Sequence, residues 1–200
     1  MKLNSLTDDH IDVVAHQTAK NGKAFCGDSY FFTITEDYFV CVLADGLGSG
    51  EFAYEASAAV IDAVKQHHHE SVEALMKMGN AALLQKRGAA VTIFKVYFHT
   101  REFVYSCVGN IRFFMYSSKG KLTYPLPVTG YLSGRPQIFH TQRFSYEPHS
   151  KFIVYSDGYE FQGVKSLLKG LFPVRMIADE IIQQYPKSDD DATFIIGSLL

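Results

Sequence analysis

The chain has no tryptophan, only three cysteines and almost no net charge. Cys26, Cys41 and Cys107 are odd in number and lack CxxC spacing, which argues against a disulfide framework or a zinc knuckle and fits a reducing compartment. A net charge of -2 provides no bulk attraction to nucleic acid or to an anionic membrane. The sequence therefore predicts a protein that binds neither nucleic acid nor membrane.

Long hydrophobic runs are also missing. No stretch approaches the roughly 20 apolar residues of a membrane-spanning helix, and residues 1–12 are polar and acidic, unlike a signal peptide. We therefore expect a soluble, cytoplasmic protein. Hydrophobic residues still make up 47% of the 200 positions, enough to bury a substantial core. Because no linker divides the chain, residues 1–200 are predicted to form one domain and, being small and nearly neutral, a monomer.

Short β-branched and aromatic runs alternate with turns, and the runs at 30–35 and 38–44 are expected to pair as a hairpin. Two regions show helical spacing of apolar residues, the first of them beginning at Phe52, and Ser71 is expected to be the N-cap of a further helix. Most predicted strands are joined by short turns, which indicates an α+β fold with antiparallel pairing. Two antiparallel sheets flanked by helix pairs, or one sheet with helices on one face, would both bury these elements. Strands are predicted at residues 30–35, 38–44, 90–98, 102–108, 111–117, 122–124, 138–146, 151–156 and 193–199, and helices at about 52–64, 72–85 and 173–185.

Two buried strands end in the same dipeptide. The apolar run 39–44 stops at Asp45-Gly46, and the run 152–156 stops at Asp157-Gly158. Asp28 precedes the strand at 30–35, and Asp190 lies in the acidic loop 188–191 before the last strand. If these strand ends meet at one edge, the carboxylates need a hard cation, and ligation by oxygen alone suits Mg²⁺ or Mn²⁺ better than Zn²⁺.

Simpler interpretations exist for each feature alone. Asp-Gly is a common turn, and an acidic run is usually a solvated loop. Residues 46–50 (GLGSG) follow a strand and precede a helix, so a phosphate cradle and a flexible turn are equally favoured. Residues 67–69 (HHH) end a predicted helix and are expected to form a cationic C-terminal cap or a solvated face rather than a metal site, and Lys86-Arg87 is expected to lie on the surface. Only the joint pattern of carboxylates indicates an oxygen-ligated metal site.

Five motifs occur in the order seen in metal-dependent protein serine/threonine phosphatases of type 2C, and the chain resembles that family over nearly its whole length. Two further segments, KRGAA at 86–90 and PLPVTGYLSG at 125–134, resemble small stand-alone members that act in the bacterial stressosome. The five motifs are GDS at 27–29, ADGLGSG at 44–50, SCVGNIRF at 106–113, SDG at 156–158 and DDAT at 190–193.

The resemblance implies a four-layer αββα sandwich with two Mn²⁺ or Mg²⁺ ions at one edge. By motif match, Asp45 bridges both ions, Asp28 and the carbonyl of Gly46 complete one site, and Asp157 and Asp190 complete the other. A water activated between the ions would attack phosphorus, so Asp45 and Asp28 are catalytic through the metals. The implied substrates are phosphorylated stressosome proteins of the RsbS and RsbR type, which gives negative feedback on the general stress response.

Two departures from the family pattern leave an alternative open. Lys23 replaces a phosphate-binding arginine and offers charge without a bidentate fork. Asn110 replaces an aspartate, which makes a third metal doubtful. Both changes would also suit a non-catalytic regulator that binds phosphoproteins, although such a binder does not need four ligand aspartates. A nucleotide-dependent ATPase or kinase around residues 46–50 is disfavoured because the loop lacks a Walker lysine.

Overall fold

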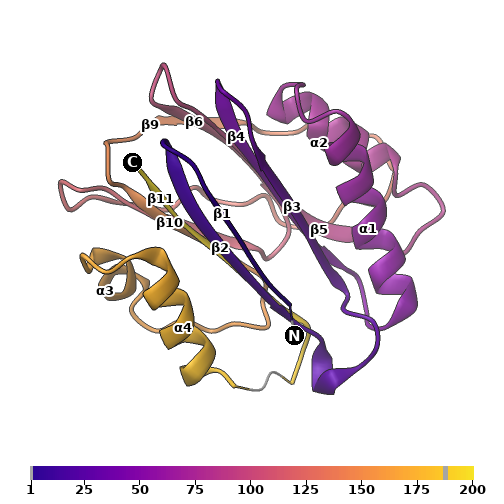
Figure 1. The fold of residues 1–200 in the computed structure, drawn as a ribbon. Helices are drawn as coiled ribbons and strands as arrows, with labels where there is room; N and C mark the ends of the chain where they lie inside the picture. Colours follow the sequence, from indigo (N-terminus) through magenta and orange to yellow (C-terminus); the bar gives the residue numbers. More distant parts are fainter. Residues whose placement is uncertain (1, 187–188) are drawn as a thin grey trace.

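Two β-sheets pack face to face, and a pair of helices covers the outer face of each (Figure 1). The computed structural model describes residues 2–186 and 189–200, so Ser188 of the predicted acidic loop lies outside the described residues. Every strand pair in the two sheets is antiparallel. The four layers confirm the predicted α+β sandwich, and the single-sheet alternative is wrong.

The elements divide between the layers as follows. The first sheet has the order β1 (Lys2–Thr7), β2 (Ile11–Thr18), β11 (Ala192–Leu199), β10 (Lys151–Tyr155), β7 (Arg112–Tyr116), β8 (Leu122–Thr123). The second has the order β3 (Asp28–Ile34), β4 (Tyr38–Gly46), β5 (Ala89–Tyr97), β6 (Glu102–Val108), β9 (Gln142–Ser145). The remaining elements are the short 3₁₀ turn η1 (Lys20–Gly22) and the helices α1 (Glu51–Gln66), α2 (Val72–Ala81), α3 (Val164–Lys169) and α4 (Val174–Gln184).

The central core lies between the sheets and is rich in aromatic rings. Phe94 of the second sheet meets Phe113 and Phe152 of the first, edge to face, with ring centroids 5.0 and 5.3 Å apart. All three side chains are fully buried. Such pairs add about 0.5–1.5 kcal/mol each beyond the burial of their area. They hold the two sheets in a fixed relation, which also fixes how the strand ends of the two sheets meet at their edge.

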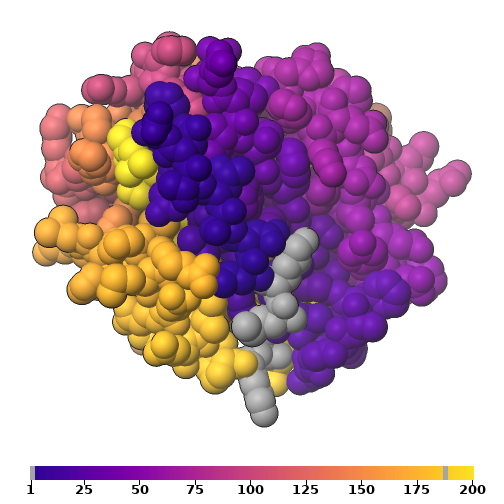
Figure 2. Space-filling model, viewed as in Figure 1, coloured from indigo at the N-terminus to yellow at the C-terminus, as the bar shows by residue number. Residues whose placement is uncertain are grey.

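Each helix pair packs on the outer face of its sheet and forms a further apolar cluster there. Val60 and Val64 of α1 pack on the second sheet, and Ile177 and Ile181 of α4 pack on the first. In Figure 2 the N-terminal strands, in indigo, run across this face between the C-terminal helices and the helices α1 and α2.

Among the described helices, none combines the length and hydrophobicity that crossing a bilayer requires.

Lys95 of β5 is the polar exception inside the α1–α2 layer. Its side chain is 1% exposed, and Nζ donates to the carbonyl oxygens of His68 and Glu70 at 2.9 Å each. The ammonium also lies 3.8 Å from the ring centroid of Tyr38. The histidine segment thus begins directly after α1, which ends at Gln66, and the buried lysine binds main-chain carbonyls of the turn that follows the helix.

Several predicted boundaries differ from the structure. The β3–β4 hairpin and the Ser71 N-cap of α2, whose side chain accepts from the Ala74 N–H at 3.2 Å, are confirmed. Helix α2 ends at Ala81 rather than at 85, and the strand expected at 138–146 covers only Gln142–Ser145. Phe52, counted in the buried stripe of α1, is 60% exposed. Strands β1 and β2 and helix α3 were not predicted.

Candidate metal centre

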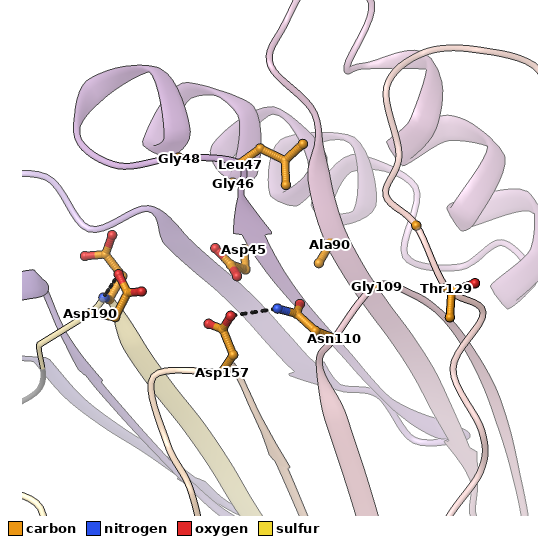
Figure 3. Close-up of a pocket in the computed structure, with 12 residues that line it drawn as sticks. Asp45, Gly46, Leu47, Gly48, Ala90, Gly109, Asn110, Thr129, Asp157 and Asp190 are labelled. Atoms are coloured by element: carbon orange, nitrogen blue, oxygen red, sulfur yellow. Dashed lines mark hydrogen bonds between the residues drawn. The ribbon is translucent and has the colours of Figure 1, made fainter.

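The predicted carboxylates gather at one edge of the sandwich. Asp28 begins β3 and Asp45 lies at the end of β4, and the antiparallel register places them directly opposite each other. Asp157 follows β10 and Asp190 precedes β11, so the first sheet delivers its acidic strand ends to the same place. A pocket is lined by these residues of both sheets: Asp45, Gly46, Gly48, Asn110, Asp157, Asp190 and Asp191 (Figure 3).

Asp28 is not among the residues that line this pocket, but it joins the two sheets through Ser156. Ser156, next to the Asp157 turn, donates its hydroxyl to Asp28 Oδ2 at 2.6 Å and accepts the Thr193 N–H at 2.9 Å. The Asp28 side chain is almost fully buried, and its other oxygen, Oδ1, has no hydrogen-bond partner. A buried carboxylate oxygen without a partner is costly, and a cation is the natural partner for it.

The carboxylates also destabilise one another's ionised forms. Burial raises the pKa of Asp28 to about 7, against the opposing hydrogen bond from Ser156. Burial, followed by the charges of Asp28 and Asp157, raises the pKa of Asp45 to about 8. Asp157 is shifted in the same direction by burial and by Asp190. This shortage of positive charge fits a divalent cation bound by oxygen ligands.

Asp157 has one neutral neighbour that orients it. Asn110 Nδ2 donates to Asp157 Oδ2 at 2.7 Å (Figure 3). In the same view the Asp45 and Asp157 carboxylates point into a common space. Because the amide carries no charge, it orients the Asp157 side chain without adding to the negative charge of the site.

The two aspartates before β11 differ in environment. Asp190 is exposed and forms an ion pair with Lys20, with Nζ and Oδ1 3.3 Å apart. Asp191 is 5% exposed and accepts the Lys20 backbone N–H at 2.9 Å. The Asp190 carboxylate in turn accepts the N–H of Asp191. Asp190 therefore presents an exposed carboxylate to the pocket, while Asp191 holds η1 near the start of β11.

Both Asp-Gly glycines allow a close approach of main chain. A Cβ on Gly46 would lie 1.9 Å from the Ala53 carbonyl oxygen of α1. A Cβ on Gly158 would lie 2.2 Å from the Asp191 carbonyl oxygen. Each glycine thus sets the distance between an acidic strand end and the neighbouring element, which explains why the dipeptide occurs twice.

Most of the predicted site residues are brought together, with two qualifications. Lys23 is exposed beyond η1 and is not among the residues that line the pocket. Within the described part of the chain, no group of three or more acidic, histidine or cysteine side chains is arranged so that it could hold a metal ion as it stands. The carboxylates therefore flank the pocket. Sequence reasoning missed the roles of Ser156, Thr193 and Asp191, although all three stand inside the motifs SDG and DDAT.

Known proteins are similar to this chain in sequence and in fold. The family model of stage II sporulation protein E (SpoIIE) matches residues 35–198. The phosphoserine phosphatase RsbX of Bacillus subtilis (strain 168) is 41% identical over 191 residues, which cover 96% of each chain. A crystal structure of RsbX in complex with magnesium superposes with a TM-score of 0.95, at 40% identity and over 100% of both chains.

A further solved structure comes from work on the bacterial stressosome. It has a TM-score of 0.85 and 24% identity, and covers 94% of this chain and 100% of that one. At this identity the likeness shows the fold alone. Because the family model spans most of the chain and RsbX exceeds 40% identity, the chain belongs to the SpoIIE family and is a metal-dependent phosphatase of the type 2C fold.

Proposed function

We propose that this protein removes phosphate from phosphoserine and phosphothreonine of stressosome proteins, with two Mn²⁺ or Mg²⁺ ions held by Asp28, Asp45, Gly46, Asp157 and Asp190. The observation that carries the metal site is the buried, unpartnered Oδ1 of Asp28 beside carboxyls of raised pKa. RsbX, which has been crystallised with magnesium, supports the use of a divalent cation.

Each side chain has a distinct proposed part. Asp45 faces carboxylates from both sheets, so it is the one suited to bridge two ions, and the Gly46 carbonyl adds a neutral ligand beside it. Asp28 is held by Ser156 with one oxygen left over. Bound cations would supply Lewis acidity and lower the pKa of a water molecule. Asn110 and Lys20 keep Asp157 and Asp190 oriented toward the pocket.

The substrate proposal draws on relatives. RsbX is a phosphoserine phosphatase, and the stressosome structure shares the fold. We therefore assign phosphorylated proteins of the RsbS and RsbR type as substrates, met by a cytoplasmic, monomeric enzyme that opposes the general stress response. The competing proposal, a regulator that binds phosphoproteins without turning them over, is favoured only by the neutral Asn110 and by Lys23.

The deciding experiment measures phosphate release from a phosphorylated RsbS-type protein. Purified protein should act only with Mn²⁺ or Mg²⁺, and Asp45→Asn should abolish the release while leaving the fold intact. Asp9→Asn, which removes one exposed carboxylate from a turn, is the matched control and should remain active. Full activity of Asp45→Asn, or of wild type in excess chelator, would contradict the proposal. Binding of the phosphoprotein without single-turnover hydrolysis would establish the regulator instead.

Metal stoichiometry separates the roles of the two Asp-Gly aspartates. Calorimetric titration with Mn²⁺ should detect two ions in wild type and neither in Asp45→Asn. Asp157→Asn should keep one ion, because Asp157 belongs to one site only. Equal losses in the two variants would show that Asp45 is not the bridge.

A further inference from the structure

Arg87 packs against the loop that follows Asp45 and that lines part of the acidic pocket, although the sequence suggested plain surface. Its Nη1 atom is 2.8 Å from the place that a Cβ on Gly48 would occupy, and Gly48 lines the pocket. The main chain beside Arg87 is tied to the same loop, because the Leu47 N–H donates to the Gly88 carbonyl at 3.0 Å. The guanidinium is thereby set against the loop that follows Asp45.

The guanidinium has an anchor but no counter-ion. It lies over the ring of Phe52, 5.0 Å from the centroid, and that ring is 60% exposed. Among the residues that the structure describes, Arg87 forms no ion pair. Stacking on an aromatic face leaves the edge of the guanidinium, with its N–H donors, free to meet an anion.

Other cations near the pocket are worse placed for a substrate. Lys20 is engaged by Asp190. Neither Lys23 nor Arg87 lines the pocket itself, but Arg87 packs against Gly48, which does. The lining itself is acidic, so a phosphate group approaching from solvent needs a cation before it reaches the depth of the site. A planar guanidinium can give two parallel hydrogen bonds to phosphate oxygens, which lysine cannot.

We propose that Arg87, held over Phe52, is a substrate-binding residue that receives the phosphate group of the phosphoprotein beside the pocket. This inference rests on the proposed phosphatase activity. It makes the loop 46–50 part of the substrate site through its glycine, because any side chain at Gly48 would displace the guanidinium. It also gives the phosphate a bidentate partner that Lys23 does not supply.

The test compares Arg87→Ala, Arg87→Lys and Lys86→Ala with wild type in Mn²⁺. Lys86 is the exposed neighbour, so its variant loses the same charge one position away. We expect Arg87→Ala to raise KM for p-nitrophenyl phosphate and for the phosphoprotein, and the inhibition constant of inorganic phosphate, by about tenfold. The value of kcat should change far less, Arg87→Lys should recover part of the loss, and Lys86→Ala should match wild type.

A second variant checks the anchor. Phe52→Leu keeps an apolar side chain but removes the aromatic face, so it should raise KM in the same direction as Arg87→Ala and by less. Melting temperatures of all variants should equal that of wild type, because both side chains are exposed. An active wild type with unchanged KM and phosphate inhibition in Arg87→Ala would overturn this inference, whereas an inactive wild type would overturn the proposed function itself.

Discussion

Asn110 shows how a single neutral residue can organise an acidic site. Its amide donates to Asp157 at 2.7 Å, and it also lines the pocket. An ionised carboxylate at this position could not donate, and its charge would raise the pKa of Asp157 further, beyond the effects of burial and of Asp190. Loss of a residue that orients a metal-binding side chain in this way typically lowers metal affinity or activity by about 10–100-fold.

Asn110→Ala should therefore weaken Mn²⁺ binding by about tenfold, because Asp157 loses the partner that orients it. Isothermal calorimetry on the purified variant measures this directly and does not depend on activity. Thr129→Ala is a suitable control, since Thr129 lines the same pocket without a hydrogen bond to Asp157. An unchanged affinity in Asn110→Ala would mean that the hydrogen bond has no role in metal binding.

At the scale of elements, the contact between β4 and α1 depends on Gly46. We expect Gly46→Ala to cost about 3 kcal/mol or more, because the new methyl group would overlap the Ala53 carbonyl and push the helix from the strand. Urea unfolding monitored by circular dichroism gives the free energy of unfolding. Gly170→Ala is the control, since its Cβ would meet only the exposed ring of Phe172, at 3.1 Å. Equal stability of the two variants would refute this account of the Asp-Gly dipeptide.

An element could be predicted from the sequence when its buried positions form an uninterrupted apolar pattern. The β3–β4 hairpin was predictable because β4 is apolar throughout and stops at Asp45-Gly46. Strand β2, IDVVAHQT, was missed because Asp12, His16 and Gln17 interrupt the apolar pattern. His16 is nevertheless buried, hydrogen-bonded through Nδ1 to the Tyr159 hydroxyl at 2.9 Å. Ile138 misled in the opposite direction, since it is 83% exposed.

The candidate ligand residues could be predicted because they stand within sequence motifs. The contacts between residues far apart in the sequence could not, because they arise only from the packing of the two sheets. Asp28, Asp45, Asp157 and Asp190 could be selected because each stands at a strand end within a motif. The Ser156–Asp28 hydrogen bond joins residues 128 positions apart and exists only because the two sheets meet at this edge. Arg87 likewise gains its place from the fold, through Phe52 and Gly48, which local sequence does not connect.

At the scale of the whole molecule, the buried carboxyls at the edge where the two sheets meet should make the stability of the metal-free protein depend on pH. Asp28 and Asp45 have pKa values of about 7 and about 8, raised mainly by burial, and in the unfolded chain both return to ordinary values near 3.8. The folded state then binds more protons than the unfolded state, so the free energy of unfolding falls as the pH rises toward 8. His16 acts in the opposite sense, because burial lowers its pKa from 6.5 and acidification therefore destabilises the fold.

Between pH 6.5 and 8 the carboxyls titrate in the folded state together with Lys95, whose pKa burial lowers to about 8 and whose loss of a proton acts in the opposite sense. Comparison with Asp45→Asn therefore isolates the contribution of the carboxyl. The metal-free wild type should lose about 1.4 kcal/mol per pH unit for each extra proton that the folded state holds. Asp45→Asn removes one such group and should show a shallower slope. Bound Mg²⁺ requires ionised carboxylates and binds only the folded chain, so its stabilisation should be larger at the upper end of this range. Urea unfolding with and without Mg²⁺ tests both statements, and a Mg²⁺ effect independent of pH would show that protons and the cation do not compete for the edge where the sheets meet.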